Sequence, residues 1–322
     1  MRILLFKTGP LGDVLMTTPA VRQLRKQYPD ARIDYMVGTG CLAILQQNPY
    51  LDNVIPFDAT AFFEHRIKDM WSAVKLMRGY DMAFIFDKHW IFPLAAWLAR
   101  IPCRIGFQRD APSRLFLNNS VLYGPIRHET LYYLDLIKKT GVDIDEDDLQ
   151  LDLHIREKTQ QRMDRMLSKR RLEHFVCCIN SGGNNPGERG HVRRLPDSIF
   201  KRLVAELATA HNVVLIGGKQ DHKYYERLHL PATDLAGTLS IEESAAVMRR
   251  AQRIYTTDCG PMHIAAAVNR HITAYFGPTN PARKAPLVDD GKSIWTDQDI
   301  YDERYELYGR LPEGTFFRRM PT

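Results

Sequence analysis

Short apolar runs alternate along the chain with longer runs in which apolar residues recur every three or four positions. The first pattern predicts buried strands and the second predicts amphipathic helices. In the first half, strands are expected at 3–7, 32–37, 53–56, 82–86 and 104–106. Helices are expected between and after them, at 15–28, 42–47, 62–79, 93–99 and 128–139. Such alternation is typical of a parallel sheet covered by helices on both faces.

The second half repeats this alternation. Its strands are expected at 175–180, 212–216, 253–256, 272–276 and 293–295. Its helices are expected at 159–170, 197–209, 222–228, 241–250 and 263–268. A polar, acidic segment at 141–148 separates the halves and is interpreted as a linker. Because 322 residues suit two domains of ordinary size, we expect domains at 1–150 and 151–322.

Composition narrows the class of protein. Hydrophobic residues make up 44% and charged residues 25%, as in ordinary globular chains. No apolar run approaches the ~20 residues of a membrane-spanning helix, and the start does not resemble a signal peptide. The five cysteines are odd in number and show no CxxC spacing, which suits a reducing compartment and argues against structural zinc. We therefore expect a cytoplasmic location.

The formal net charge of +6 points to an anionic partner or to a solvated basic surface. Basic residues cluster at 165–171, 189–194 and 318–319. Nucleic acid, an anionic membrane surface and a phosphorylated or acidic substrate are the three candidate partners. The chain carries no nucleic-acid-binding signature, so no nucleic-acid partner is expected.

The most informative segment joins a predicted strand to a predicted helix through Asp258, Cys259, Gly260 and Pro261. Proline is well tolerated in the first turn of a helix, where its missing N–H has no helical partner. Such a junction directs free N–H groups and the helix dipole to one place, where a diphosphate fits. Gly260 permits close approach of a ligand, and His263 adds a side-chain donor. The alternative is an ordinary strand-to-helix turn.

Three separated motifs carry a family resemblance. The first is Asp258-x-Gly260-x-x-His263-x-x-Ala266-Ala267, followed by a strand and Phe276-Gly277-Pro278-Thr279-x-Pro281. The second is an N-terminal strand followed by Gly12-Asp13 and Thr17-x-Pro19-Ala20. The third is Asn180-Ser181-Gly182-Gly183, with Arg193-Arg194-Leu195-Pro196 downstream. Together they resemble the lipopolysaccharide heptosyltransferases of glycosyltransferase family 9, over residues 1 to about 285.

The resemblance implies the GT-B architecture, in which two Rossmann-like domains face each other across a cleft. Residues 1–150 would bind the acceptor and residues 151–322 the nucleotide sugar. The implied reaction is inverting transfer, with heptose moving from ADP-heptose to an acceptor of lipopolysaccharide-core type. The implied partners are this donor and an anionic glycolipid at the inner membrane face, where the enzyme would be peripheral. No metal, other cofactor or stable protein partner is expected.

Two alternatives to this function remain open. The chain could use another nucleotide sugar, or a protein or small-molecule acceptor. It could instead be a catalytically inactive nucleotide-binding module. An intact Asp13 beside an intact Asp258-x-Gly260-x-x-His263 turn favours the active enzyme.

In the first half, Asp13 is the candidate base, as the resemblance implies, because the acceptor hydroxyl must lose a proton. From its spacing alone, a helix N-cap is the favoured interpretation of Asp13, and the resemblance reverses this preference. Gly12, Lys88 and His89 are the candidate acceptor-binding residues, since each follows a predicted strand.

In the second half, the donor-binding candidates include Ser181, Gly182 and Asp221, beside the turn formed by Asp258, Cys259, Gly260, Pro261 and His263. Asp221 would either bind the ribose, as the resemblance implies, or cap a helix. Arg193 occupies the position of the family's lysine and would stabilise the leaving diphosphate. Arg189 and Arg194 are its alternatives.

Overall fold

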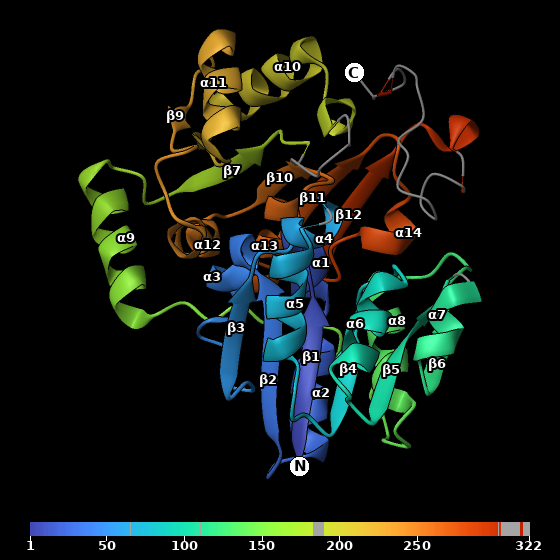
Figure 1. The fold of residues 1–322 in the computed structure, drawn as a ribbon. Coiled ribbons are helices and arrows are strands. Elements are labelled where there is room, and N and C mark those ends of the chain that lie inside the picture. Colours follow the sequence, from blue (N-terminus) through green and yellow to red (C-terminus); the bar gives the residue numbers. More distant parts are fainter. Residues whose placement is uncertain (65, 110, 183–189, 302, 304–315, 318–322) are drawn as a thin grey trace. The chain divides into compact units, whose positions relative to one another are not determined.

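The structure of the chain is a computed structural model that describes residues 1–64, 66–109, 111–182, 190–301, 303 and 316–317. The chain divides into two compact units, Met1–His154 and Ile155–Thr322. In Figure 1 the first unit runs from blue to green and the second from yellow-green to red. Each unit contains one six-stranded sheet.

The sheet of the first unit is parallel throughout, with the order β3-β2-β1-β4-β5-β6. Its strands are β1 Arg2–Lys7, β2 Arg32–Gly38, β3 Asn53–Phe57, β4 Met82–Ile85, β5 Cys103–Gln108 and β6 Asn119–Leu122. In β1, every residue after Arg2 is buried, as expected of a central parallel strand with helices on both faces.

Short helices connect these strands. They are α1 Leu11–Met16, α2 Thr18–Gln27, α3 Leu42–Leu45, α4 Thr60–Phe63, α5 Ile67–Leu76, α6 Ile91–Leu98, α7 Ala111–Phe116 and α8 Glu129–Lys138. A 3-10 turn, Thr39–Cys41, precedes α3. The core on one face joins Phe6 of β1 and Ile85 of β4 to Val74 of α5 and Phe92 of α6.

The second unit has the sheet order β12-β11-β10-β7-β8-β9, again with every pair parallel. Its strands are β7 Phe175–Ile179, β8 Asn212–Leu215, β9 Thr233–Asp234, β10 Ile254–Thr257, β11 His271–Phe276 and β12 Asp290–Trp295. Its α-helices are α9 Glu157–Lys169, α10 Asp197–Ala208, α11 Lys219–Leu228, α12 Ile241–Arg250, α13 Gly260–Val268 and α14 Pro281–Lys284. Gly190–Arg193 and Gln298–Ile300 form 3-10 turns.

The two sheets share one topology. When the strands of each unit are numbered in chain order, both sheets read 3-2-1-4-5-6, the order of dinucleotide-binding Rossmann folds. The order reverses between β1 and β4 in the first unit and between β7 and β10 in the second. Ligands bind open α/β sheets beside the carboxyl ends of strands at this reversal. The topology therefore directs attention to the segments that follow these four strands.

Most predicted elements are present, and the differences have local causes. The helix predicted at 15–28 is two helices, α1 and α2, which meet at Thr17. The hydroxyl of Thr17 donates to the Val14 carbonyl, and Pro19 lacks the N–H that a continuous helix would need. Four short elements are not predicted by the sequence pattern, namely β6, β9, α7 and α14, which span between two and six residues each.

Candidate functional site

A buried ion pair joins the two central strands of the first unit at the point where the sheet order reverses. Lys7 is the last residue of β1, and only 3% of it is exposed. Its ammonium lies 3.0 Å from the carboxylate of Asp87, which follows β4. Asp87 also accepts hydrogen bonds from the backbone N–H and the hydroxyl of Thr8. A buried carboxylate is tolerated here because a cation and two further donors satisfy it.

Asp13 lies beside this pair. It is the third residue of α1, and its carboxylate is 3.7 Å from the Lys7 ammonium. The alternative that Asp13 is the helix N-cap is wrong, because Pro10 occupies that position. The Asp13 side chain is 19% exposed, whereas that of Lys7 is 4% exposed. The arrangement presents one carboxylate to solvent and holds it next to a buried positive charge.

The three predicted acceptor-binding residues lie at the carboxyl ends of the same strands. Gly12 is buried in the first turn of α1. Lys88 follows Asp87, and its ammonium donates to Glu129 and to the Tyr123 hydroxyl, each at 2.8 Å. His89 is exposed, with its ring stacked near that of Trp90. Lys88 is therefore held by the fold, whereas His89 presents its ring to solvent.

In the second unit, hydroxyl hydrogen bonds extend the pairing of β7 and β10 beyond their ladder. The Thr257 hydroxyl donates to the Ser181 carbonyl at 2.6 Å and accepts from the Ser181 N–H at 3.2 Å. Ser181 and Gly182 are both buried. These bonds hold the segment after β7 against the end of β10. The strand order of the second sheet reverses between these two strands.

The predicted diphosphate turn begins directly after β10. Cys259 is the N-cap residue of α13 and provides no side-chain capping bond, and Gly260 and Pro261 are the first helical residues. Burial raises the pKa of Cys259 to about 12, so its thiol stays protonated at neutral pH. His263, in the same first turn, is only 4% exposed.

Asp258 is buried at the start of this turn, and Arg193 lies beside it. One guanidinium nitrogen of Arg193 is 3.7 Å from Asp258 Oδ2, and the two side chains are 7% and 3% exposed. Burial alone would raise the pKa of Asp258, but the charges of Arg193 and Lys284, with contributions from Thr279 and His263, hold it below its usual value. Asp258 is therefore an anion that balances the cations around it.

The neighbouring arginine has a different partner. Arg194 donates to Asp221 at 2.7 Å, and its guanidinium lies 4.5 Å above the ring of Tyr224. Asp221 is the third residue of α11 and also accepts from the N–H of Gly218, which is the N-cap residue. The alternative that Asp221 is a helix N-cap is therefore wrong, and Asp221 instead supports the start of α11 from within its first turn. Arg189, the other alternative to Arg193, lies outside the described residues.

One charged residue beside Asp13, Lys7, was not predicted from the sequence as a functional candidate. Its signal was available, because it is a charged residue that ends a buried apolar strand. What the sequence could not supply is that β1 and β4 are neighbours.

Two further features are absent from the described part of the chain. Among the residues whose placement is described, no group of three or more histidine, cysteine, aspartate or glutamate side chains could hold a metal ion. Within the same part of the chain, no helix has the length and apolar character needed to span a bilayer.

The proteins of known sequence that are similar to this chain include two lipopolysaccharide heptosyltransferases. The chain is 27% identical over 317 residues to lipopolysaccharide heptosyltransferase 2 of Escherichia coli K12, covering 91% of this chain and 88% of the relative. It is 26% identical over 296 residues to lipopolysaccharide heptosyltransferase 3 of Escherichia coli, covering 88% and 86%.

Solved structures show the same fold. The glycosyl transferase family 9 protein of Veillonella parvula matches with a TM-score of 0.79 and 20% identity, covering 97% of this chain and 90% of that one. The Escherichia coli ADP-heptose heptosyltransferase II matches with a TM-score of 0.73 and 24% identity, covering 95% and 98%. The expected GT-B fold class, with its two Rossmann-like parallel sheets, is confirmed.

The model of glycosyltransferase family 9 (heptosyltransferase) matches residues 71–306, which is most of the chain. The resemblance carried by the three motifs is therefore confirmed, and the chain belongs to glycosyltransferase family 9 and is a glycosyltransferase.

Proposed function

We propose that this enzyme transfers heptose from ADP-heptose to an acceptor of lipopolysaccharide-core type, with inversion at the anomeric carbon. The relatives named above support the sugar and the acceptor class. The Escherichia coli heptosyltransferase WaaC, solved with ADP and with ADP-2-deoxy-2-fluoro heptose, matches this chain with TM-scores of 0.72 and 0.70. These complexes support an ADP-linked donor here.

The observation that carries the proposal is the position of Asp13, a partly exposed carboxylate 3.7 Å from a buried lysine at the sheet reversal. Asp13 accepts the proton of the acceptor hydroxyl as the hydroxyl oxygen attacks the anomeric carbon. The bond between that carbon and the diphosphate oxygen breaks, and ADP leaves with the electron pair. Lys7 fixes the carboxylate in place, so it is a positioning residue.

The donor half-site is proposed at the turn between β10 and α13. Gly260 and Pro261 form the first helical positions, where N–H groups and the helix dipole favour a diphosphate. Arg193 and His263 supply positive charge or hydrogen-bond donors to the leaving group. Asp258 orients Arg193 and does not touch phosphate, because two anions would repel each other.

Other donor contacts are assigned to the segments that follow β7 and β8. Ser181 and Gly182 would lie along the nucleotide, and Asp221 would approach the ribose. Asp221 already accepts hydrogen bonds from Arg194 and Gly218, so a ribose hydroxyl would use its remaining lone pairs.

We further propose that transfer needs no divalent metal. The buried guanidinium of Arg193, together with Lys284 and His263, surrounds Asp258 with positive charge. Such fixed cations stabilise a leaving diphosphate as a metal ion does in other transferases. The acceptor would be an anionic glycolipid at the inner face of the membrane, contacted by Gly12, Lys88 and His89, with the enzyme peripheral to that membrane.

The direct test is a transfer assay with purified enzyme, ADP-heptose and a lipopolysaccharide-core acceptor that lacks the terminal heptose. We expect an acceptor product heavier by one heptose residue in mass spectrometry, and NMR should show the anomeric configuration opposite to that of the donor. Thermal shift with a panel of nucleotide sugars adds an independent readout, since a ligand of the folded state raises Tm. Stabilisation by another nucleotide sugar, with no response to ADP-heptose, would contradict the proposed donor.

A further inference from the structure

Three adjacent helices of the first unit expose large apolar side chains to solvent. The exposed fractions are 70% for Ile67 and 45% for Trp71 on α5, 49% for Trp97 on α6 and 77% for Leu115 on α7. Helix α6 packs against both α5 and α7, and the rings of Trp97 and Phe116 are 5.9 Å apart. We call the outer face of α5, α6 and α7 the α5–α7 surface. Clustered exposed apolar side chains mark interaction sites far more often than scattered ones do.

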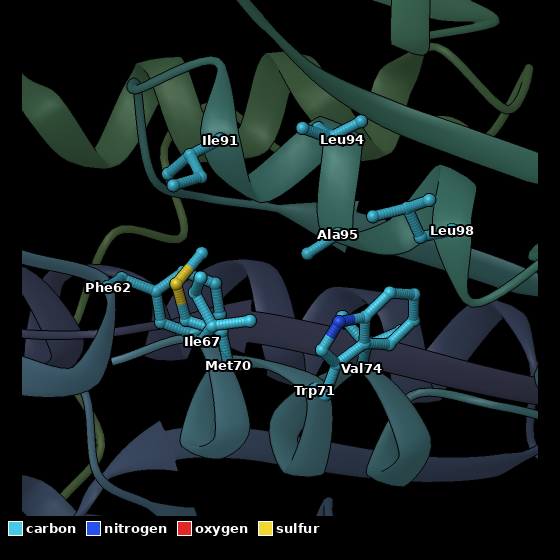
Figure 2. Close-up of a pocket in the computed structure, with 9 residues that line it drawn as sticks. All are labelled: Phe62, Ile67, Met70, Trp71, Val74, Ile91, Leu94, Ala95 and Leu98. Carbon is cyan, nitrogen blue, oxygen red and sulfur yellow. The ribbon is translucent and has the colours of Figure 1, made fainter. Parts of the chain in front are cut away.

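A hollow of about 120 Å³ opens into this surface between α5 and α6. Figure 2 shows Ile91, Leu94 and Leu98 on one side of the hollow, facing Ile67 and Trp71 on the other. The indole nitrogen of Trp71 is the only polar side-chain atom drawn there. An apolar hollow of this kind favours hydrocarbon over water.

Basic side chains lie on or next to the same three helices. Exposed basic residues lie on the three helices or within two residues of their C-terminal ends, namely Lys68, Lys75, Arg78, Arg100 and Arg114. The acidic residue described on these helices is Asp69, which pairs with Arg66. Arg66 in turn also pairs with Asp58 and Glu64. The α5–α7 surface therefore combines exposed apolar side chains with an excess of basic over acidic side chains.

The spacing along α5 places apolar and basic side chains next to each other. Ile67 and Trp71 are four residues apart and share one face of the helix. Lys68 is the next residue after Ile67, and Lys75 is four residues after Trp71, so both ammonium groups can extend past the edge of the apolar stripe. Apolar and aromatic side chains flanked by lysines are typical of helices that lie in a membrane interface. Tryptophan is favoured there because its ring is apolar and its N–H can reach water.

We propose that the α5–α7 surface docks the enzyme on an anionic lipid bilayer, with Ile67, Trp71, Trp97 and Leu115 inserted at headgroup level. The five basic side chains contact anionic headgroups. Charge complementarity favours an anionic bilayer over a second copy of the chain, because two copies would place two basic surfaces against each other. The proposal rests on the peripheral membrane location proposed above and names the surface responsible for it, but it depends on neither the donor nor Asp13.

The experiment measures co-sedimentation of the full chain with vesicles of phosphatidylcholine alone and of phosphatidylcholine mixed with phosphatidylglycerol. We expect binding to the mixed vesicles at low salt, weakened by added salt, and little binding to the neutral ones. A basic side chain near an anionic surface contributes about a factor of five to partitioning, so K68Q/K75Q should bind about 25-fold more weakly. W71S should bind about tenfold more weakly, because one large apolar side chain no longer inserts.

Matched variants elsewhere control for net charge and for apolar surface. R165Q/K169Q removes two positive charges from α9, and L287S removes an exposed leucine from the second unit; both should bind as the parent does. Circular dichroism and thermal unfolding verify that each variant is folded. Equal losses in K68Q/K75Q and R165Q/K169Q, or unchanged binding in W71S, would overturn the proposal. So would a dimer in vesicle-free solution that W71S converts to a monomer, because the surface would then bind a second copy. No step measures transfer, so failure here and failure of the proposed reaction are distinguishable.

Discussion

The ammonium of Lys7 lies 3.7 Å from the carboxylate of Asp13, and the two residues come from β1 and from the helix that follows it. The same ammonium is 3.0 Å from Asp87, so one buried cation connects two carboxylates of different exposure. Asp87 is buried and held by Thr8, which makes it structural. Asp13 is the carboxylate that a substrate can reach, and this division of roles leads to separate predictions for the two.

For Asp13, we predict that Asp13→Asn removes transfer while leaving donor binding intact. Loss of a general base typically lowers the rate by about 10²–10⁴-fold. Asparagine is nearly isosteric, so the fold should be unaffected, and Asp13→Glu serves as a variant that keeps the charge. Steady-state kcat and calorimetric titration with ADP measure the two effects. A near-normal kcat in Asp13→Asn would show that this carboxylate is not the base.

For Lys7, we predict that its substitution lowers both stability and activity, and that a second substitution separates these two effects. Lys7→Gln leaves Asp87 buried without its cation, which should lower the free energy of unfolding by about 3–5 kcal/mol. Adding Asp87→Asn removes the stranded charge and should restore much of that stability. Transfer should stay impaired in the double variant, because Asp13 still lacks its neighbour. Urea denaturation and kcat are the two measurements, and a fully active double variant would rule out a positioning role.

For the turn between β10 and α13, we predict that His263→Ala and Gly260→Val weaken ADP binding by about 10- to 100-fold, the range for a lost hydrogen bond to a charged group. The valine also places a side chain where backbone approach is needed. His211→Ala, at an exposed position of the same unit, is the matched control. Titration calorimetry measures the affinity, and unchanged affinity in both variants would exclude this turn as the diphosphate site.

For the cation, we predict that transfer survives EDTA but falls strongly in Arg193→Gln. Arg193→Lys should be intermediate, since lysine keeps the charge but loses the planar, bidentate geometry. Arg194→Gln should mainly lower stability, because Arg194 is bound to Asp221 and stacked on Tyr224. Transfer rates with and without chelator, measured beside thermal unfolding, distinguish these outcomes. Loss of activity on chelation that Mg²⁺ reverses would instead make Asp258 a metal ligand.

The last prediction concerns the acid stability of the second unit. Glu242 accepts hydrogen bonds from the side chain and the backbone N–H of Arg156, and these bonds lower its pKa from 4.5 to about 2. A carboxylate whose pKa is lower in the folded than in the unfolded state stabilises the fold at pH values above the unfolded-state pKa. This stabilisation is lost as the pH falls through the folded-state pKa. The stabilisation by Glu242 is therefore lost as the pH falls from 4.5 to about 2.

Glu242→Gln should consequently flatten the pH dependence of Tm within this window. The effect at neutral pH should be about 1 kcal/mol or less, because Arg156 is half exposed and solvent screens the pair. Glu226→Gln, at an exposed position on α11, provides the control. Identical Tm profiles for the parent and Glu242→Gln would show that the pair contributes nothing.

Much of the fold was predictable because its signals are local. The helix predicted at 241–250 has these bounds in the structure, where Ser240 and Glu243 form the capping box that their spacing encodes. The turn at Asp258 was predictable for the same reason, since its strand, proline and helix are contiguous. In contrast, β9 has two residues, too few for any periodicity to indicate a strand.

The pairing within the sites was not predictable from periodicity. Lys7 and Asp87 are 80 positions apart, and Arg194 and Asp221 are 27 apart. Their contacts depend on which strands are neighbours, and apolar patterns reveal that strands exist without giving their order. The N-cap interpretation of Asp13 failed for a related reason, because α1 begins at Leu11, within a segment that shows no apolar repeat.

Each sheet draws all of its strands from a single contiguous half of the chain, and this has a consequence during synthesis. The last strand of the first sheet ends at Leu122, whereas the second sheet needs β12, which ends at Trp295. Translation proceeds at about 5–20 residues per second, and domains generally fold as units in the order in which they emerge. The N-terminal sheet can therefore assemble on the ribosome on the order of ten seconds before its C-terminal counterpart is complete. During that interval the nascent chain would carry the half-site of Lys7, Asp13 and Asp87 without a donor turn.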